Sequence, residues 1–154
     1  MITFLLIVHG LVAVALLGAI THQAVAICWP GRNNNSITSA LRAVNAAVYT
    51  KAIIVLFLLS TVLGGVIYPA YRMAVRTYLE NARLWNANGS FELKEQFIAI
   101  ALGMLPLYWF IWRKPLDPVL ARARQAVTLM IAFTVWFGFI VGHVLNNIRG
   151  LFGL

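Results

Sequence analysis

The sequence predicts an all-α integral membrane protein, an antiparallel bundle of four transmembrane helices that forms one domain over residues 1–154. Two observations predict this fold. The chain is 62% hydrophobic and only 10% charged, with a mean hydropathy of +0.85, whereas soluble domains carry about 25% charged residues. The apolar residues also gather in four runs, at residues 2–29, 51–72, 96–112 and 125–147. Each run has about the length that a helix needs to cross a hydrocarbon core.

The first run is predicted to be a retained span rather than a cleaved signal peptide. Residues 24–26 look like a cleavage site, but the run lacks a basic n-region and its apolar core is too long. The loop that follows is rich in turn-forming residues, with Pro30, Gly31 and three consecutive asparagines at 33–35. Residues 37–49 are then predicted to form a short interfacial helix in this first loop.

The second and third spans are joined by a polar segment. The helical pattern of the second span continues past Pro69, which is predicted to kink it. Residues 86–90 are predicted to form the turn before the third helix, with Ser90 as the N-cap and Glu92 in an acidic first turn. The third loop, residues 113–118, contains Pro115 and Pro118 and is predicted to be short and rigid.

The net charge of +8 does not indicate nucleic-acid binding, because the basic residues lie mainly at span ends, where they face lipid headgroups and set topology. The side with loops one and three carries seven: Arg32, Arg42, Lys51, Arg113, Lys114, Arg122 and Arg124. The side with both termini and loop two carries five: Arg72, Arg76, Arg83, Lys94 and Arg149. The positive-inside rule therefore predicts both termini on the non-cytoplasmic side, in what we take to be a bacterial inner membrane.

Two further patterns predict how the spans are placed. Aromatic residues near the span ends are predicted to be interfacial anchors, namely Trp29, Trp85, Tyr108, Trp109 and Trp112. Helix faces with small or polar residues are predicted to point into the bundle, because small residues let helices approach closely. Gly18, Gly103 and His143 lie on such faces of the first, third and fourth spans.

All three histidines, His9, His22 and His143, fall inside apolar runs. An ionisable ring within a bilayer costs several kcal/mol unless a partner compensates it, so such residues point to function. From the helical rise, His9 lies about 9 Å from the membrane midplane, and Tyr68 and His143 about 10 Å on the same side. Glu95 lies about 13 Å out on that side, and His22 about 10 Å on the other. His9 and His143 are therefore predicted to meet in one layer.

Two neutral imidazoles on facing helices suit low-spin iron, so His9 and His143 are predicted to bind a b-type haem as its iron ligands. Tyr68 would lie beside them, and Arg72 and Arg76 would neutralise the haem propionates. The alternative is that both are core histidines, bonded to backbone carbonyls or to Tyr68.

A metal site formed by His9, His143 and Glu95 is a further alternative. Carboxylate-rich bundle sites usually use a Glu-x-x-His motif, which this sequence lacks. His22 is predicted to be a lone packed histidine, and the less favoured alternative is a haem held by His22 and Met130. The single cysteine, Cys28, excludes an intramolecular disulfide and any site built from several cysteines.

These residues predict a small membrane-embedded redox or electron-transfer subunit of a respiratory complex, which carries haem b and exchanges electrons with quinone or a partner redox protein. The alternative is a non-enzymatic accessory subunit that stabilises a larger membrane complex without a cofactor. A small transporter or channel is disfavoured because central polar groups are few. No residue is predicted to be catalytic, since hydrolase, phosphate-loop and zinc patterns are absent from the sequence.

The expected partners are the lipid bilayer and either other membrane subunits or further copies of the chain. Within the chain, Glu92 or Glu95 is predicted to pair with Arg72 or Arg76 across the second loop, because these residues lie on facing stripes.

Overall fold

The computed structural model describes residues 1–28 and 45–151, and within these ranges it contains helices and no strand. Four long helices carry the architecture: α1 (Ile2–Cys28), α3 (Tyr49–Ala70), α5 (Trp85–Trp112) and α6 (Ala121–Leu151). The helical stretches Ile2–Cys28, Ala46–Asn81, Trp85–Trp112 and Ala121–Ile148 are each long and apolar enough to cross a membrane. The all-helical class and the four apolar helices are therefore confirmed. Trp29 and most of the predicted interfacial helix at 37–49 lie outside the described residues.

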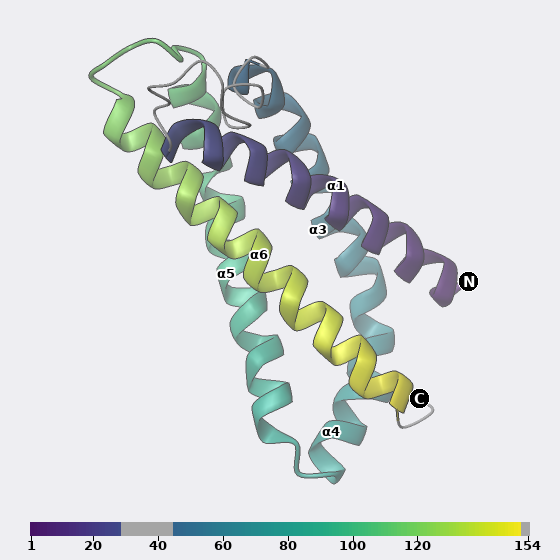
Figure 1. The fold of residues 1–154 in the computed structure, drawn as a ribbon. Helices are drawn as coiled ribbons and strands as arrows, with labels where there is room; N and C mark the ends of the chain where they lie inside the picture. The colour runs from purple at the N-terminus through teal and green to yellow at the C-terminus, as the bar shows by residue number, and fades with distance from the viewer. Residues whose placement is uncertain (29–44, 152–154) are drawn as a thin grey trace, which may run out of the picture.

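The first and last long helices are neighbours. α1 packs against both α3 and α6, while α5 packs against α6 and, over fewer residues, against α3. Figure 1 shows α1 crossing α6 near one end of the molecule, after which the N-terminal part of α1 and the C-terminal part of α6 diverge. The hydrogen bond between Thr21 and Trp136 joins these two helices, whereas His9 and His143 lie on the parts that diverge.

The second helix is longer than its apolar run. Ala46–Val48 form a 3₁₀ turn, η1, before α3, and α3 continues into a π-helical turn, η2 (Tyr71–Arg76), and then into α4 (Thr77–Asn81). Pro69 lies inside α3, where it removes one backbone hydrogen bond and crowds the preceding turn. The wider turn begins two residues later, and π-turns of this kind are frequent at functional sites.

The turn between the second and third helices lies earlier than predicted. Residues 86–90 belong to α5, and Ser90 donates a hydrogen bond to the Asn86 carbonyl (2.7 Å) instead of capping the helix. The chain reverses at Arg83, whose backbone is left-handed (φ 58°). The prediction was wrong because it weighed the polar side chains alone. Leu84, Ala87 and Phe91 pack against a small cluster formed by Leu79, Val141 and Leu145, which favours a helix through this segment.

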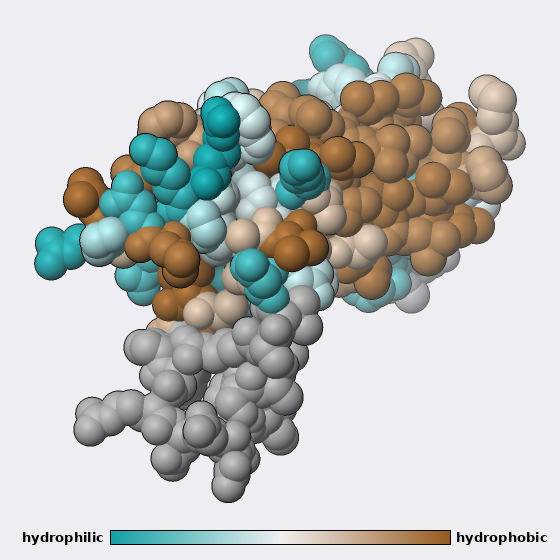
Figure 2. All heavy atoms as spheres, turned by 90° about the horizontal axis from the view of Figure 1, so that it is seen from above, coloured by the Kyte–Doolittle hydropathy of each residue, from teal (hydrophilic) through white to brown (hydrophobic). Residues whose placement is uncertain are grey.

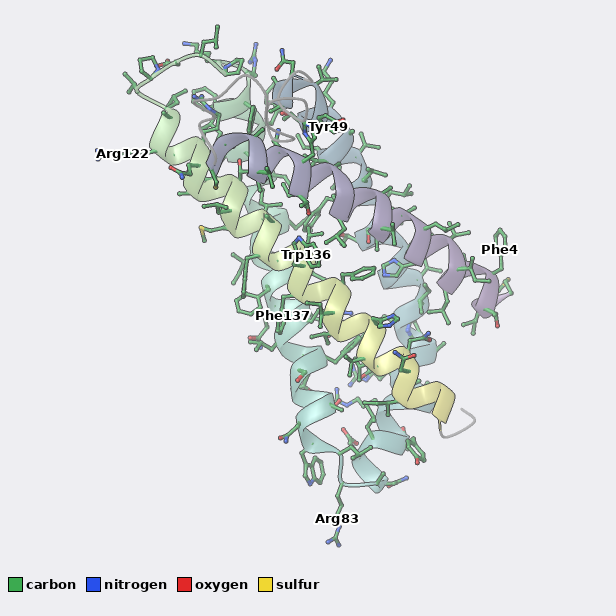
Figure 3. The ribbon with its side chains drawn as sticks, in the orientation of Figure 1. Phe4, Tyr49, Arg83, Arg122, Trp136 and Phe137 are labelled. Atoms are coloured by element: carbon green, nitrogen blue, oxygen red, sulfur yellow. The ribbon has the colours of Figure 1, made fainter. Side chains whose placement is uncertain are left out.

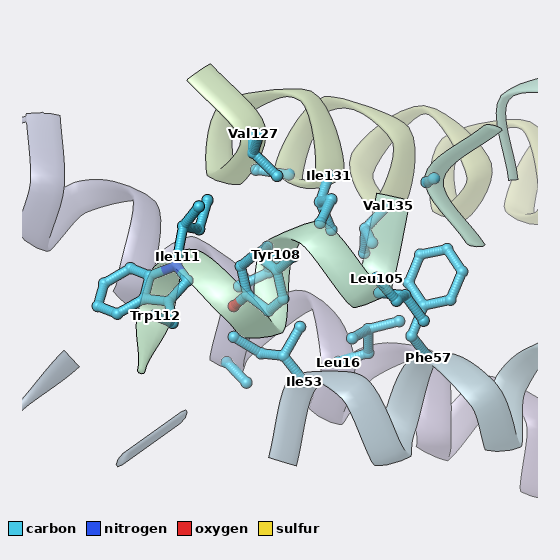
Figure 4. Close-up of a cluster of buried hydrophobic side chains, with 14 residues drawn as sticks. Leu16, Ile53, Phe57, Leu105, Tyr108, Ile111, Trp112, Val127, Ile131 and Val135 are labelled. Carbon is cyan, nitrogen blue, oxygen red and sulfur yellow. The ribbon is translucent and has the colours of Figure 1, made fainter. Parts of the chain in front are cut away.

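The main core lies at one end of the molecule. Its buried side chains come from all four long helices, and Figure 4 labels ten of them: Leu16, Ile53, Phe57, Leu105, Tyr108, Ile111, Trp112, Val127, Ile131 and Val135. None of residues 1–15 is buried. We call the end with the main core, near η1 and the α5–α6 loop, the closed end. The opposite end, which holds residues 1–15 of α1, η2 and the α4–α5 turn, is the open end.

Much of the surface is apolar. Large hydrophobic side chains are exposed on every long helix, for example Phe4 (67%), Val55 (61%), Ile100 (57%) and Phe133 (57%). Figure 2 shows hydrophobic residues covering much of the surface, while hydrophilic residues gather toward one side of the view. Water solvates such a surface poorly, whereas lipid chains or partner subunits would cover it.

The predicted inward faces are wrong at several positions. Gly18, Gly103 and His143 are exposed. The buried face of α1 instead carries larger residues, including Leu16 and Ile20. Bulky apolar side chains bury more surface than glycine, so they fill the core of the single chain. The small-residue faces remain available for packing against something outside it.

Candidate functional site

The closed end contains a buried hydrogen-bond network. The side-chain amide of Gln23 in α1 donates to the Ala46 carbonyl (3.0 Å) and to the Thr50 hydroxyl of α3 (3.1 Å). The hydroxyl of Tyr108 in α5 donates to the amide oxygen of Gln23. Gln23 and Tyr108 have no exposed surface. One amide therefore connects three helices, and its donors and acceptor all have partners, as a buried polar group requires.

Two more hydrogen bonds complete the connection among the four helices. The indole of Trp112 in α5 donates to Thr128 of α6 (3.1 Å), and that of Trp136 in α6 donates to Thr21 of α1 (3.0 Å). Together with the Gln23 network, these bonds connect every long helix to its neighbours. Hydrogen bonds between membrane helices contribute about 0.6 kcal/mol each on average, so this network orients the helices as well as stabilising them.

Arg124 organises the α5–α6 loop. Its guanidinium donates to the carbonyls of Lys114 (2.9 Å), Asp117 (3.2 Å) and Ile111 (3.5 Å). Only 8% of Arg124 is exposed. The sequence places Arg124 among the charges that face lipid headgroups, but in the structure it binds the C-terminal end of α5, where the helix dipole favours a cation.

The aromatic residues near span ends have different roles. Trp85 and Trp109 are exposed, as anchors would be, whereas Tyr108 and Trp112 are buried in the core. The prediction that all of them are interfacial anchors is therefore wrong for Tyr108 and Trp112. Each has a polar atom that finds a buried partner on another helix, and this satisfies the condition for burying a Tyr or Trp ring.

At the open end, His9 packs against α3. A methyl group at Gly64 would stand 3.5 Å from the Cε1 atom of His9, and the ring also interacts with the backbone of Ser60. The His9 Nδ1 atom is buried and has no hydrogen-bond partner among the described residues. One edge of the imidazole is thus held by α3, while Nδ1 can accept a hydrogen bond or bind a metal.

His143 lies on α6 with its ring stacked parallel to that of Phe139, the centroids 6.3 Å apart. The residue is exposed. If α6 crosses a bilayer, this ring faces lipid, a cofactor or another subunit. An imidazole is costly in lipid, so the position calls for a partner.

Aromatic rings from α3, η2 and α5 form a stack at the open end. Phe91 lies 3.8 Å from Tyr71 and 6.4 Å from Tyr68, measured between ring centroids. The Tyr71 hydroxyl is buried without a hydrogen-bond partner among the described residues. Tyr71 also interacts electrostatically with Glu95 of α5. Tyr68, the predicted neighbour of the histidines, belongs to this stack.

Lys94 is a residue that the sequence argument missed. Its ammonium lies 4.1 Å from the centroid of the Phe91 ring, and its aliphatic stem would stand 3.7 Å from a methyl group at Gly138 of α6. Its charge acts on both His9 and Glu95. His9, Tyr71, Lys94 and Glu95 therefore form one group of polar side chains, which we call the open-end cluster. The signal available for Lys94 was its position two residues before an apolar run.

The predicted ion pair across the second loop is confirmed for one pair. Arg76 of η2 lies 3.2 Å from a carboxylate oxygen of Glu92 and 2.8 Å from one of Glu80. These side chains are partly exposed, so each pair contributes about 0–1 kcal/mol. Arg76 is thus engaged by two carboxylates, whereas Arg72 is exposed. Of the two arginines predicted to face haem propionates, Arg72 has the freer charge.

No three side chains of His, Cys, Asp or Glu within the described residues gather in a group that could hold a metal ion. His9, His143 and Glu95 therefore do not form a three-ligand site in this structure. His22 stacks its ring on Tyr49 (4.5 Å between centroids) and lines an apolar groove with Trp136. It lies toward the closed end, away from the open-end cluster.

These features define the class of protein: an all-helical chain with four helices of membrane-spanning length, connected by hydrogen bonds at the closed end and bearing a polar cluster at the open end. Comparisons with protein-family models, curated proteins and solved structures found no match.

Proposed function

We propose that this chain is an integral membrane subunit that carries electrons through a b-type haem bound at the open end by His9 and His143. The observation that carries the proposal is the Nδ1 atom of His9 in α1, which is buried and has no hydrogen-bond partner among the described residues. The exposed His143 ring supports it, because a histidine on a membrane helix requires a compensating partner. When bound, haem would supply reversible one-electron chemistry.

The chain's own residues have defined tasks in this proposal. His9 and His143 would hold the iron, and the contact with α3 would fix the His9 ring. Arg72 and Lys94 supply positive charge for the propionates, since Arg76 is already paired with carboxylates. Glu95 and Tyr71 would provide a polar route for a quinone head group or a partner redox protein at the same end.

The membrane setting is part of the proposal. The four apolar helices and their exposed hydrophobic side chains support insertion as an antiparallel bundle. We place the chain in a bacterial inner membrane with both termini outside the cytoplasm, following the basic residues of loops one and three. Cysteine labelling in a Cys28→Ser background tests the orientation. A probe at Asn34 that reacts from outside intact cells, with one at Gly153 that does not, would invert it.

An accessory subunit without a cofactor is the second candidate. The exposed small-residue faces at Gly18 and Gly103 favour it, because such faces suit close packing against other helices. In that case His143 would be compensated by a side chain of a partner subunit instead of by iron.

The absorbance spectrum of the purified protein separates the two candidates. A reduced-minus-oxidised α band in the wild type is expected, with strong loss of the band in His9→Ala and in His143→Ala. His22→Ala is the matched control and should keep the band, because His22 lies at the other end of α1. A colourless wild-type protein, purified after expression with ample haem supply, would contradict the redox function and favour the accessory subunit.

A further inference from the structure

A groove runs between the α4–α5 turn and the C-terminal half of α6. It encloses about 560 Å³. Its floor is formed by the buried side chains of Val141 and Leu145, and Val144 forms part of its wall. Arg83 and Trp85 line it from the turn. The groove is thus apolar along α6 and basic at the turn.

The α4–α5 turn forms the rim of the groove, and its backbone is strained at Arg83. Arg83 is the non-glycine residue with positive φ among those described, at 58°. It follows α4 in a reversal where Arg83 N–H donates to the Glu80 carbonyl (3.0 Å) and Leu84 N–H to the Leu79 carbonyl (2.8 Å). Glycine is the favoured residue at this helix-ending position, because a Cβ atom is disfavoured there. Strained residues cluster at functional sites, so the backbone at Arg83 is consistent with a role for its side chain.

The positive charge of Arg83 at the rim has no acidic partner among the described residues. Arg83 is exposed, and no ion pair joins it to an acidic side chain within the described residues. No Asp or Glu lines the groove. Trp85 is 62% exposed, and indole rings favour the headgroup level of a membrane. The turn therefore presents a cation and an interfacial anchor directly above an apolar channel.

We propose that this groove binds an anionic glycerophospholipid, with one acyl chain along Val141, Val144 and Leu145 and the phosphate at the Arg83 guanidinium. The apolar floor matches a hydrocarbon chain, and the unpaired arginine matches a phosphate, which it binds through two parallel hydrogen bonds. The site rests on the membrane insertion proposed above, and none of the residues that line it is assigned to the haem.

The test uses full-length protein in a neutral detergent, to which phosphatidylglycerol or phosphatidylcholine is added. Native mass spectrometry measures bound lipid. Phosphatidylglycerol is expected to bind about fivefold more tightly than phosphatidylcholine, the gain from one basic side chain near a membrane surface. Arg83→Ala should remove that preference. Arg122→Ala is the matched control, because Arg122 is also exposed but lies at the opposite end of the molecule (Figure 3).

Two further variants test the two halves of the site. Arg83→Gly removes the charge and relieves the backbone, so it should lose the phosphatidylglycerol preference while the fold remains intact. Val144→Trp fills the channel and should weaken binding of both lipids. Val144 is exposed, so the substitution leaves the core unchanged.

Three results would overturn the proposal. Equal binding of both lipids to the wild type would show that the Arg83 charge does not select the anionic lipid. Unchanged binding in both Arg83→Ala and Val144→Trp would place the lipid elsewhere. A lower particle mass for Val144→Trp without any change in lipid binding would show that a second copy of the chain occupies the groove. Extraction of membranes with carbonate tests insertion separately: a chain released by carbonate contradicts the membrane proposal itself.

Discussion

The two ends of the molecule differ in how their buried polar groups are paired. At the closed end, the donors and acceptors of Gln23, Tyr108 and Trp112 are paired across helices. At the open end, His9 Nδ1 and the Tyr71 hydroxyl are buried without partners among the described residues. A paired network stabilises a fold, whereas unsatisfied polar atoms cost free energy that a ligand can recover. The closed end therefore holds the helices, and the open end is where a ligand is expected.

The largest expected effect is at the closed end. Gln23→Ala leaves the Tyr108 hydroxyl without its acceptor and removes the amide donor to Thr50 and Ala46. Each stranded buried group costs about 1–3 kcal/mol. Unfolding titrated with sodium dodecyl sulfate should show this loss in the free energy of unfolding. Gln96→Ala is the control, because Gln96 is exposed. A stability loss no larger than that of the control would contradict the role given to the network.

Arg124 should have the next largest effect. Arg124→Ala removes the hydrogen bonds to the Lys114, Asp117 and Ile111 carbonyls, and charged hydrogen bonds contribute about 1.5–3 kcal/mol. The same titration measures the change, with Arg122→Ala as the exposed control from the same turn of α6. Equal losses for the two variants would show that the contacts to the loop carbonyls contribute little.

A substitution at Arg83, at the open end, should raise the free energy of unfolding instead of lowering it. Arg83→Gly is expected to stabilise the protein by about 1 kcal/mol, because glycine adopts the left-handed conformation without the Cβ penalty. The unfolding titration is made on protein stripped of anionic lipid, so that loss of lipid binding does not offset the gain. A destabilised variant would mean that the Arg83 side chain makes contacts that outweigh its backbone strain.

The smallest effect is expected at the Arg76–Glu92 pair. Arg76→Ala, Glu92→Ala and the double variant form a thermodynamic cycle, whose coupling free energy should be about 0–1 kcal/mol and should shrink as salt is added. The Arg76–Glu80 pair remains in Glu92→Ala and limits its effect. A coupling well above this range, insensitive to salt, would show that the pair is shielded from water.

The sequence predicts the features that depend on hydropathy and charge better than those that depend on packing between helices. Composition and the lengths of the apolar runs give the four helices, and opposite charges at Arg76 and Glu92 give one ion pair correctly. The contact between the first and last helices is also as expected. These features depend on hydropathy and charge, which each residue carries wherever it lies.

The closed end depends on which residues meet across helices, and one sequence does not contain that information. Tyr108 and Trp112 near a span end look like interfacial anchors, yet their polar atoms reach Gln23 and Thr128 inside the core. Gln23 is an isolated amide within an apolar run. This isolation was the one sequence signal that could have indicated a buried hydrogen-bond network. The turn predicted at residues 86–90, at the open end, was misplaced for a similar reason. The packing of Leu84 and Ala87 against α6 outweighs the turn preference of Asn86 and Asn88.

Distances between spin labels test the contrast between the two ends most directly. One pair joins Cys28 of α1 to a label at Arg122→Cys of α6, at the closed end. The other joins Ile7→Cys to Asn147→Cys in a Cys28→Ser background, on the same two helices at the open end. All four positions are exposed. Because buried contacts are concentrated at the closed end, we expect a narrow distance distribution there and a broad one at the open end, which narrows when haem is added. Equal widths at both ends, or a broader distribution at the closed end, would contradict the account.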